Sequence, residues 1–313
     1  MANINMMNFK QSLFLLLFVV FIPASAFAQY GTVDNSLSVN SEILDREMSY
    51  SVYLPESYHT STRDYPVLYL MHGMTGDHND WINVGEMHRI AGKAIAKGKA
   101  PEMIIVMPDG LYDSFYINNY DGSLNWEDFF HEEFIPEVEN QFRISSNRNN
   151  RAIAGLSMGG YGAMYHAVKY KEKFSAVYAM SAAFLEVEPL EEGEERSGWN
   201  RDFYLKTWGP DNEYGLPENY KEHSIQEMFK AMDPVEENDR PWTPGAEETV
   251  QLPQIFIDCG DDDFLLNENM NLVKILNDKN VDFEFRVHDG AHTWEYWRTA
   301  LGATMQFIGD SFR

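Results

Sequence analysis

The sequence predicts an α/β fold in which helices cover both faces of a mostly parallel, doubly wound β-sheet. First, short apolar runs alternate with helix-length amphipathic segments along most of the chain. Second, several of these runs are apolar throughout, as strands are when both faces of a parallel sheet are covered. Third, 313 residues with 44% apolar and 14% aromatic side chains are typical of a folded globular protein. This alternation indicates one domain built from βαβ units.

The charge of the chain disfavours several classes of partner. There are 24 Lys and Arg residues against 49 Asp and Glu, which gives a formal net charge of −25. Such a surface repels phosphate backbones and anionic lipids, so we expect neither a nucleic-acid partner nor attachment to a membrane surface. The single cysteine, Cys259, has no partner for an internal disulfide, and its apolar neighbours in the sequence predict a buried, inert thiol.

The first 28 residues predict a cleavable signal peptide. Lys10 is followed by an apolar run at 13–22 and then by small residues, of which Ala26 and Ala28 favour cleavage after Ala28. The alternative is a membrane anchor without a cleavage site. The apolar run is about ten residues long, however, whereas a bilayer span needs about 20. We therefore expect a secreted or periplasmic protein without a membrane anchor, in which residues 29–313 form a single domain.

The predicted strands and helices follow one another in a regular order. Residues 50–54 alternate as a half-buried strand does, and the apolar runs at 67–71 and 103–107 suit the centre of a sheet. Residues 126–142 have apolar side chains at helical spacing and an acidic outer face. The remaining predicted strands are 151–154, 176–180, 254–257 and 282–287, and the remaining predicted helices are 159–170, 267–277 and 293 to about 308.

One long insertion, residues 184–250, interrupts this order before the strand at 254–257. It begins with an acidic stretch and continues with many aromatic residues, which include Trp199 and Trp208. A connection of this length is usually a lid or a binding element. The alternative is a helical decoration whose aromatic side chains pack against the domain, which is the commoner fate of any single aromatic residue.

The motif Gly-x-Ser-x-Gly at Gly155, Ser157 and Gly159 carries the clearest chemical signal. It directly follows a predicted strand and directly precedes a predicted helix. In this context the motif forms a nucleophile elbow, a sharp turn that holds the serine in a strained conformation and raises its hydroxyl above the sheet. The glycines are needed because a Cβ atom at either position would clash with a neighbouring strand or helix. Ser157 is therefore the candidate nucleophile.

A serine hydroxyl needs a general base, and the base needs an orienting acid. His292 is the candidate base, because among the nine histidines it alone lies in the loop between the last predicted strand and the last predicted helix. Four acids, Asp258, Asp261, Asp262 and Asp263, crowd the end of an earlier strand. We select Asp263 because it heads the helical segment that follows. The same run could be a solvated loop or a cation site, although a metal would need more oxygen ligands than the run supplies.

The negative charge that develops on the substrate in such a reaction needs two donors. The main-chain N–H of Met158, which follows the nucleophile, is the first candidate. The second is the N–H of Met74, in the loop that follows the strand at 67–71. His72 in that loop is expected to be a packed structural histidine. Aromatic rings that could stack on a substrate are Trp126, Trp199 and Trp208.

These motifs together resemble the esterase D group of α/β-hydrolases, which includes carbohydrate esterase family 1. The resemblance covers roughly residues 45–183 and 253–311 and rests on the elbow and on six further motifs. These are Tyr53-Leu-Pro55, Tyr65-Pro-Val-Leu-Tyr-Leu-Met-His-Gly73, Met107-Pro-Asp-Gly110, Trp126-Glu-Asp-Phe-Phe130, Gly260-x-x-Asp263 and Gly290-x-His292-x-Trp294. The resemblance implies ester hydrolysis through an acyl-enzyme, with Ser157, Asp263 and His292 as nucleophile, acid and base. We expect no cofactor and no metal.

The resemblance predicts the type of reaction but does not identify the substrate. The group includes feruloyl esterases, acetylxylan esterases, S-formylglutathione hydrolases and mycolyl-transferring enzymes. The predicted export signal argues against glutathione thioesters. We therefore expect a secreted carboxylesterase that removes ester groups from carbohydrates, feruloyl first and acetyl second. The alternatives are a thioesterase, an acyltransferase or a peptidase on the same scaffold, and a glycan-binding protein without catalytic activity. The sequence leaves the oligomeric state open.

Overall fold

A computed structural model describes residues 30–236 and 251–313, apart from 192 and 197–198. The predicted signal peptide at 1–28 and the end of the insertion, 237–250, lie outside the described residues. None of the helices in the described part of the chain has the length and apolar composition that a membrane span requires.

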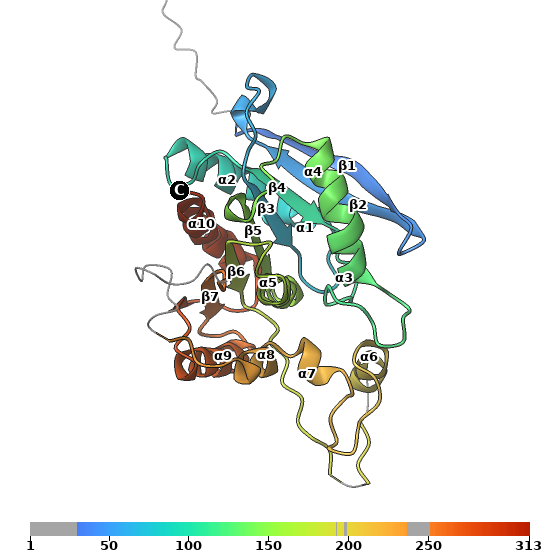
Figure 1. Ribbon diagram of the computed structural model, residues 1–313. Coiled ribbons are helices and arrows are strands. Elements are labelled where there is room, and N and C mark those ends of the chain that lie inside the picture. Colours follow the sequence, from blue (N-terminus) through green and yellow to red (C-terminus); the bar gives the residue numbers. More distant parts are fainter. Residues whose placement is uncertain (1–29, 192, 197–198, 237–250) are drawn as a thin grey trace, which may run out of the picture.

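The described strands form one sheet with the order β1-β2-β4-β3-β5-β6-β7-β8 (Figure 1). All neighbouring pairs from β4 to β8 are parallel, whereas β1 pairs with β2 and β2 with β4 in the antiparallel direction. The mostly parallel, doubly wound sheet that the sequence predicts is thereby confirmed. The strands are β1 (Thr32–Ser41), β2 (Arg46–Leu54), β3 (Val67–Met71), β4 (Ile104–Pro108), β5 (Arg151–Leu156), β6 (Ala176–Met180), β7 (Gln254–Gly260) and β8 (Phe283–His288).

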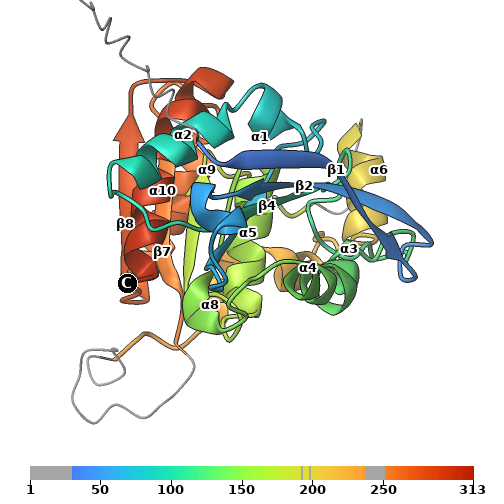
Figure 2. The ribbon, with the colours of Figure 1, turned by 90° about the horizontal axis from the view of Figure 1, so that it is seen from above.

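Helices cover both faces of the sheet, with α2 and α10 on one side and α4, α5 and α8 on the other (Figure 2). Two hydrophobic layers result, one on each face, and each is completed by the helices that cover it. The helices are α1 (Asp80–Asn83), α2 (Met87–Ala96), α3 (Trp126–Asp128), α4 (Ile135–Gln141), α5 (Met158–Lys169), α6 (Trp199–Thr207), α7 (Tyr220–His223), α8 (Ile225–Ala231), α9 (Leu266–Asp278) and α10 (Trp294–Ser311).

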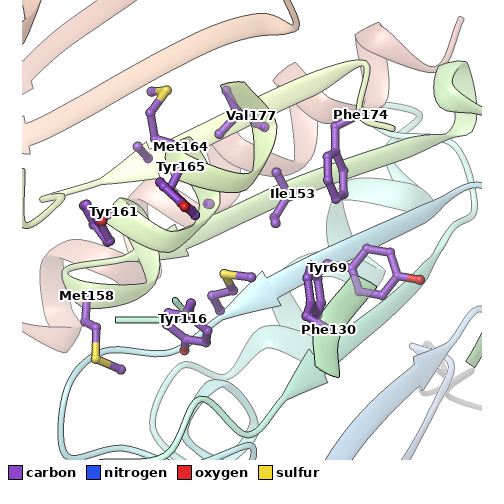
Figure 3. Close-up of a cluster of buried hydrophobic side chains, with 14 of the residues drawn as sticks. Tyr69, Tyr116, Phe130, Ile153, Met158, Tyr161, Met164, Tyr165, Phe174 and Val177 are labelled. Carbon is purple, nitrogen blue, oxygen red and sulfur yellow. The ribbon is translucent and has the colours of Figure 1, made fainter. Parts of the chain in front are cut away.

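The central strands are buried on both faces, which explains why they are apolar throughout. In β3, Leu68 and Leu70 belong to the layer under α2 and α10, while Tyr69 belongs to the opposite layer. Figure 3 shows that opposite layer, where Ile153 of β5 and Val177 of β6 lie with the side chains of α5. Because successive strand residues point to opposite faces, a strand between two helical layers needs an apolar side chain at every position.

The predicted helix at 126–142 is present but is not one regular helix. Its centre, Phe129–Phe134, is a π-helix between α3 and α4. Pro136 lies in the first turn of α4. Proline has no N–H and cannot donate the main-chain hydrogen bond of an α-helix. The change from π-helix to α-helix therefore lies where that hydrogen bond would be missing in any case.

The edge strand β1 was not predicted from the sequence. Most of its residues are exposed or half-buried, and it pairs with β2 at the edge of the described sheet. Because little of its surface is buried, it carries too few apolar residues to show the alternating pattern of a strand. Cys259, by contrast, lies as predicted: its free thiol is buried at the end of β7, and burial raises its pKa to about 12.

The described part of the insertion contributes α6, α7 and α8 (Figure 1). Five of its aromatic side chains are buried in the same hydrophobic layer as α5: Phe184, Phe203, Trp208, Tyr220 and Phe229. For these residues the second interpretation is confirmed: they belong to a helical decoration that packs against the domain. A lid role for the insertion stays a prediction.

Candidate active site

Ser157 lies at the turn between β5 and α5, at the carboxyl edge of the sheet. Its backbone has φ 53° and ψ −120°, a conformation that is unfavourable for a residue with a side chain. The Ser157 N–H donates to the carbonyl of Met180 at the end of β6, 2.9 Å away. The turn is therefore tied to the neighbouring strand, and the serine side chain projects from it as the elbow motif predicts.

The two glycines of the elbow are required by close backbone contacts. A Cβ atom on Gly155 would collide with the backbone of Gly159, and a Cβ on Gly159 would lie 2.5 Å from the carbonyl oxygen of His72. Helix α5 thus begins in direct contact with the loop that follows β3. This contact brings together the two segments that carry the predicted oxyanion donors, the start of α5 with Met158 and the loop with Met74.

Ser157, His292 and Asp263 form a continuous hydrogen-bonded chain. The Nε2 atom of His292 lies 3.0 Å from Ser157 Oγ, and its Nδ1 atom lies 2.9 and 3.1 Å from the two carboxylate oxygens of Asp263. A carboxylate can only accept, so Nδ1 carries the proton and Nε2 is left to accept the serine proton. The predicted residues are thereby brought together in the arrangement of a nucleophile, a base and an orienting acid.

Asp263 is held as a carboxylate although it is buried. Burial alone would raise its pKa, but the hydrogen bonds from His292 and from the main-chain N–H of Leu265 lower the pKa below its usual value. A negative charge on Asp263 favours a positive charge on the neighbouring imidazole ring.

The other three acids of the run have different surroundings. Asp261 accepts the Gly290 N–H at 2.9 Å, and the Asp262 N–H donates to the Gly290 carbonyl at 2.9 Å. These bonds join the loop that carries Asp263 to the loop that carries His292. Asp258 is buried beside Tyr178. Of the four candidates, Asp263 is the one that contacts His292.

The predicted oxyanion donors flank the nucleophile. Met158 is the first residue of α5, and Met74 follows Gly73, where a Cβ atom would lie 3.5 Å from the Cβ of Ser157. Within the described residues neither N–H has a protein acceptor. His72 is a packed structural histidine, as predicted: it is buried, its ring lies 2.8 Å from the Gly73 carbonyl, and it accepts the Gly110 N–H at 2.7 Å.

Three large apolar side chains near these groups are exposed. The Phe264 ring is 71% exposed and lies 4.6 Å, between ring centroids, from His292. Tyr112 is 66% exposed, and its carbonyl accepts the N–H of Thr75 beside Met74, which is 39% exposed. We call Met74, Tyr112 and Phe264 the apolar rim. Tyr112 and Phe264 are not among the residues predicted from the sequence, although Phe264 directly follows the predicted acid.

The structure corrects two of the predicted substrate contacts. Trp126 is fully buried, stacks on Phe130 and donates its indole N–H to the Asp109 carbonyl at 3.1 Å. Trp208 is also buried, and it stacks on Tyr204. Neither ring has surface left for a substrate, because each completes the hydrophobic layer. The third prediction, Trp199, begins α6, and its side chain lies outside the described residues.

A different tryptophan, Trp297, lies next to His292. Its ring packs edge-on against His292 with centroids 4.8 Å apart, and it is buried. Together with Phe264 it restricts the rotation of the imidazole ring. Its spacing of five residues from His292, just over one turn into α10, was a signal that the sequence offered.

The chain is similar to known proteins in both sequence and fold. The Esterase family model, which carries the description "Putative esterase", matches residues 41–308. An acetyl esterase from Caldicellulosiruptor saccharolyticus is 25% identical over 243 residues, which cover 77% of this chain and 82% of that protein. The solved structure of a ferulic acid esterase is 31% identical, with a TM-score of 0.72 over 90% of this chain and 99% of its own.

A further solved structure shows the same fold at lower identity. The S-formylglutathione hydrolase FrmB from Staphylococcus aureus has a TM-score of 0.66 at 23% identity, over 88% of this chain and 99% of its own. This likeness extends to the fold alone. Together with the family match, the comparisons confirm the α/β-hydrolase fold that the sequence predicts.

Proposed function

Because the chain belongs to the Esterase family and is a carboxylic ester hydrolase, we propose that it works through an acyl-enzyme on Ser157. His292 is the general base and Asp263 the acid that orients it. The observation that carries this proposal is the chain of hydrogen bonds from Asp263 through His292 to Ser157. The resemblance to the esterase D group, which the family match and the relatives confirm, points to the same three residues.

The proposed reaction has two halves. In the first, Ser157 Oγ attacks the ester carbonyl carbon while its proton passes to His292 Nε2, and the N–H groups of Met74 and Met158 bind the oxyanion. The C–O bond to the alcohol then breaks, and His292 returns the proton to the leaving oxygen. In the second half His292 takes a proton from a water molecule as the water oxygen attacks the acyl carbonyl carbon. The bond between the acyl group and Ser157 Oγ then breaks, and His292 returns the proton to Oγ as the acid leaves.

The substrate we propose is a carbohydrate esterified with a hydroxycinnamoyl group such as feruloyl, with acetyl as the second choice. Two features support a planar aromatic acyl group. One is the apolar rim: the exposed Phe264 ring lies against His292, and the exposed Tyr112 is joined through its main-chain carbonyl to the loop that carries Met74. The other is the 31% identity to a ferulic acid esterase over nearly its whole length. The acetyl esterase relative supports the second choice.

We also propose that the protein acts outside the cytoplasm, after removal of residues 1–28. This location suits an ester on a cell-wall polysaccharide and disfavours a glutathione thioester. The strongly negative net charge is consistent with a neutral substrate rather than a polyanionic one.

The test is a comparison of substrates with the wild type and the Ser157→Ala variant. We expect hydrolysis of methyl ferulate to exceed that of p-nitrophenyl acetate, acetylated xylan and S-formylglutathione in kcat/KM. Ser157→Ala should lower every activity by about four orders of magnitude or more without changing the melting temperature. Turnover of the variant within about tenfold of wild type would exclude Ser157 as nucleophile. Accumulation of a transferred acyl product instead of the free acid would indicate an acyltransferase.

A further inference from the structure

The residues that follow β6 hold the backbone of Ser157 from both sides. The Ser157 N–H donates to the Met180 carbonyl at 2.9 Å, and the Ser157 carbonyl accepts the Ala183 N–H at 3.0 Å. Ser181 between them is fully buried and has a left-handed φ of 43°. We call residues 180–184 the β6 loop. Because two main-chain hydrogen bonds join it to Ser157, a displacement of the β6 loop moves the proposed nucleophile as well.

Asn269 of α9 connects the β6 loop to the turn that carries Asp263. Its side chain is fully buried, and its amide nitrogen donates to the Ala182 carbonyl at 2.9 Å and to the Leu265 carbonyl at 2.8 Å. Both acceptors are carbonyl oxygens, so the NH₂ group of the amide, and not its oxygen, faces them. One side chain thereby joins two segments that are far apart in the sequence.

The turn at the start of α9 holds the carboxylate of Asp263. The Leu265 N–H donates to Asp263 Oδ1 at 2.9 Å, and the Leu266 N–H donates to the Asp263 carbonyl at 3.0 Å. Leu265 therefore accepts from Asn269 through its carbonyl and donates to Asp263 through its N–H. Ser157 and Asp263 are thus connected through the β6 loop and Asn269, by hydrogen bonds that do not involve His292.

The Asn269 amide is not needed to satisfy the two carbonyl groups. The Ala182 carbonyl also accepts the Phe184 N–H at 2.9 Å, and the Leu265 carbonyl also accepts the main-chain N–H of Asn269 at 3.1 Å. Within the described residues, the buried Oδ1 atom of Asn269 has no hydrogen-bond partner. A leucine would fill a similar volume without burying an unpaired acceptor. Packing and the pairing of polar groups therefore do not account for an asparagine here, whereas the connection between the two segments does.

We propose that Asn269 is a positioning residue, which fixes the distance between Ser157 and Asp263. His292 lies between these two residues, with Nε2 3.0 Å from Ser157 Oγ and Nδ1 2.9 Å from the nearer carboxylate oxygen of Asp263. A single imidazole ring can make both hydrogen bonds only while that distance is kept. The inference rests on the proposed function, because it gives Asn269 an effect on catalysis only through Ser157, His292 and Asp263.

The first test is Asn269→Leu. Loss of both amide bonds should lower kcat for p-nitrophenyl acetate by about 10- to 100-fold, because displacement of a reacting group by about 1 Å can cost about 100-fold in rate. KM should stay within about twofold, since no contact with the substrate is removed. Circular dichroism and urea denaturation should show a folded protein, because both carbonyls keep their main-chain donors.

The second variant, Asn269→Ser, separates the two amide bonds. A serine hydroxyl in a helix can donate to the carbonyl four residues before it, which is that of Leu265, but its one hydrogen cannot also serve Ala182. We therefore expect a loss of kcat similar to that in Asn269→Leu. The matched controls are Asn277→Leu and Asn277→Ser. Asn277 is exposed, and its amide donates to the Val273 carbonyl at 2.9 Å, a bond that stays within α9, so both controls should keep wild-type kcat.

A double-mutant cycle with Asp263→Asn separates positioning from a general structural effect. If Asn269 acts through the acid, Asn269→Leu should slow the Asp263→Asn protein by less than about twofold, although it slows the wild type at least about tenfold. Equal factors in both backgrounds, or wild-type kcat in Asn269→Leu and Asn269→Ser, would overturn the inference. Loss of the folded state in both variants would also overturn it, because the amide would then be required for folding. If Asp263→Asn itself kept wild-type kcat, the proposed function would be overturned first, so the two failures are distinguishable.

Discussion

At the scale of single residues, the position of a carboxylate matters more than its presence. Asp261, Asp262 and Asp263 are consecutive, but they do not have the same role in the structure. Asp263 contacts His292, while Asp261 and the Asp262 backbone bind Gly290 and so hold the two loops together. The sequence motif located this run, and the contact with His292 distinguishes its members.

Asp263→Asn should reduce kcat for ester hydrolysis by about four orders of magnitude, because an amide can stabilise the wrong tautomer of His292 and carries no charge. The control is Asp261→Asn, whose side-chain oxygen can still accept the Gly290 N–H, and it should have a much smaller effect. Steady-state kinetics with p-nitrophenyl acetate distinguishes the two. If Asp261→Asn or Asp262→Asn proved as damaging as Asp263→Asn, the assignment of the acid would be wrong.

Phe264→Ala should raise KM for methyl ferulate about three- to tenfold, because an aromatic contact of this kind contributes roughly 0.5–1.5 kcal/mol. KM for p-nitrophenyl acetate should change little, since its acetyl group is too small to cover the ring. Tyr214→Ala, which removes a ring of similar exposure from the insertion, is the control and should alter neither KM. Equal increases for both esters would contradict recognition of the acyl group by the apolar rim.

At the scale of elements, the sequence predicted the central sheet well because its strands are buried on both faces. The predictions that failed concern residues whose environment depends on distant parts of the chain. Trp126 and Phe264 illustrate this. Each lies next to a recognisable motif, yet Trp126 is enclosed by Phe130 and Tyr116 while Phe264 is exposed beside His292. Hydrophobicity alone cannot distinguish a buried ring from one left open for a ligand.

The contact between α5 and the loop after β3 should not tolerate a single methyl group. Gly159→Ala would place its Cβ 2.5 Å from the His72 carbonyl oxygen and 2.6 Å from that of Met71, and both are backbone atoms that cannot move aside alone. We expect a loss of about 2 kcal/mol or more in the free energy of unfolding, together with loss of activity. Urea denaturation measures the first effect.

The matched control for that contact is Gly302→Ala in α10. A Cβ atom there meets nothing within 4 Å, and alanine favours the helix by about 0.5–1 kcal/mol. This variant should therefore be as stable as the wild type or more so. A Gly159→Ala protein of unchanged stability and activity would show that α5 can shift away from β3.

At the scale of the whole molecule, burial of uncharged histidines connects stability to pH. Lys173 donates to His131 Nδ1 at 3.1 Å, His131 lies 2.9 Å from His166, and His166 donates to the Tyr116 carbonyl at 2.8 Å. Burial lowers the pKa of His166 to about 4 and that of His131 further. If either imidazole ring took up a second proton, the new N–H group would have no acceptor within this chain of hydrogen bonds.

The free energy of unfolding should fall as the pH decreases from 7.5 to 5. An unfolded histidine binds a proton near pH 6.5, whereas these two remain neutral in the native state, so acid favours unfolding by on the order of 2 kcal/mol for each at pH 5. Asp258 acts in the opposite direction, because its raised pKa lets the native state bind a proton first. Two histidines outweigh one aspartate. Urea titrations at both pH values measure the difference.

The control for this prediction is a pair of substitutions. His166→Asn should make the unfolding free energy less dependent on pH, because one of the groups that titrates differently in the two states is gone. His288→Gln, which replaces an exposed histidine, should leave the dependence unchanged. A protein equally stable at pH 5 and pH 7.5 would contradict the assignment of neutral, buried histidines.

The sheet topology determines when each residue of the proposed active site is added during synthesis of the chain. The elbow with Ser157 lies between β5 and β6, whereas Asp263 and His292 follow β7 and β8. A nascent chain that has emerged only as far as β6 holds the serine, the oxyanion loop and most of the sheet, yet it has no base. Such a nascent chain holds the proposed nucleophile but lacks the two residues that we propose activate it. Catalytic competence therefore comes last in translation, when the strands at one edge of the sheet are added.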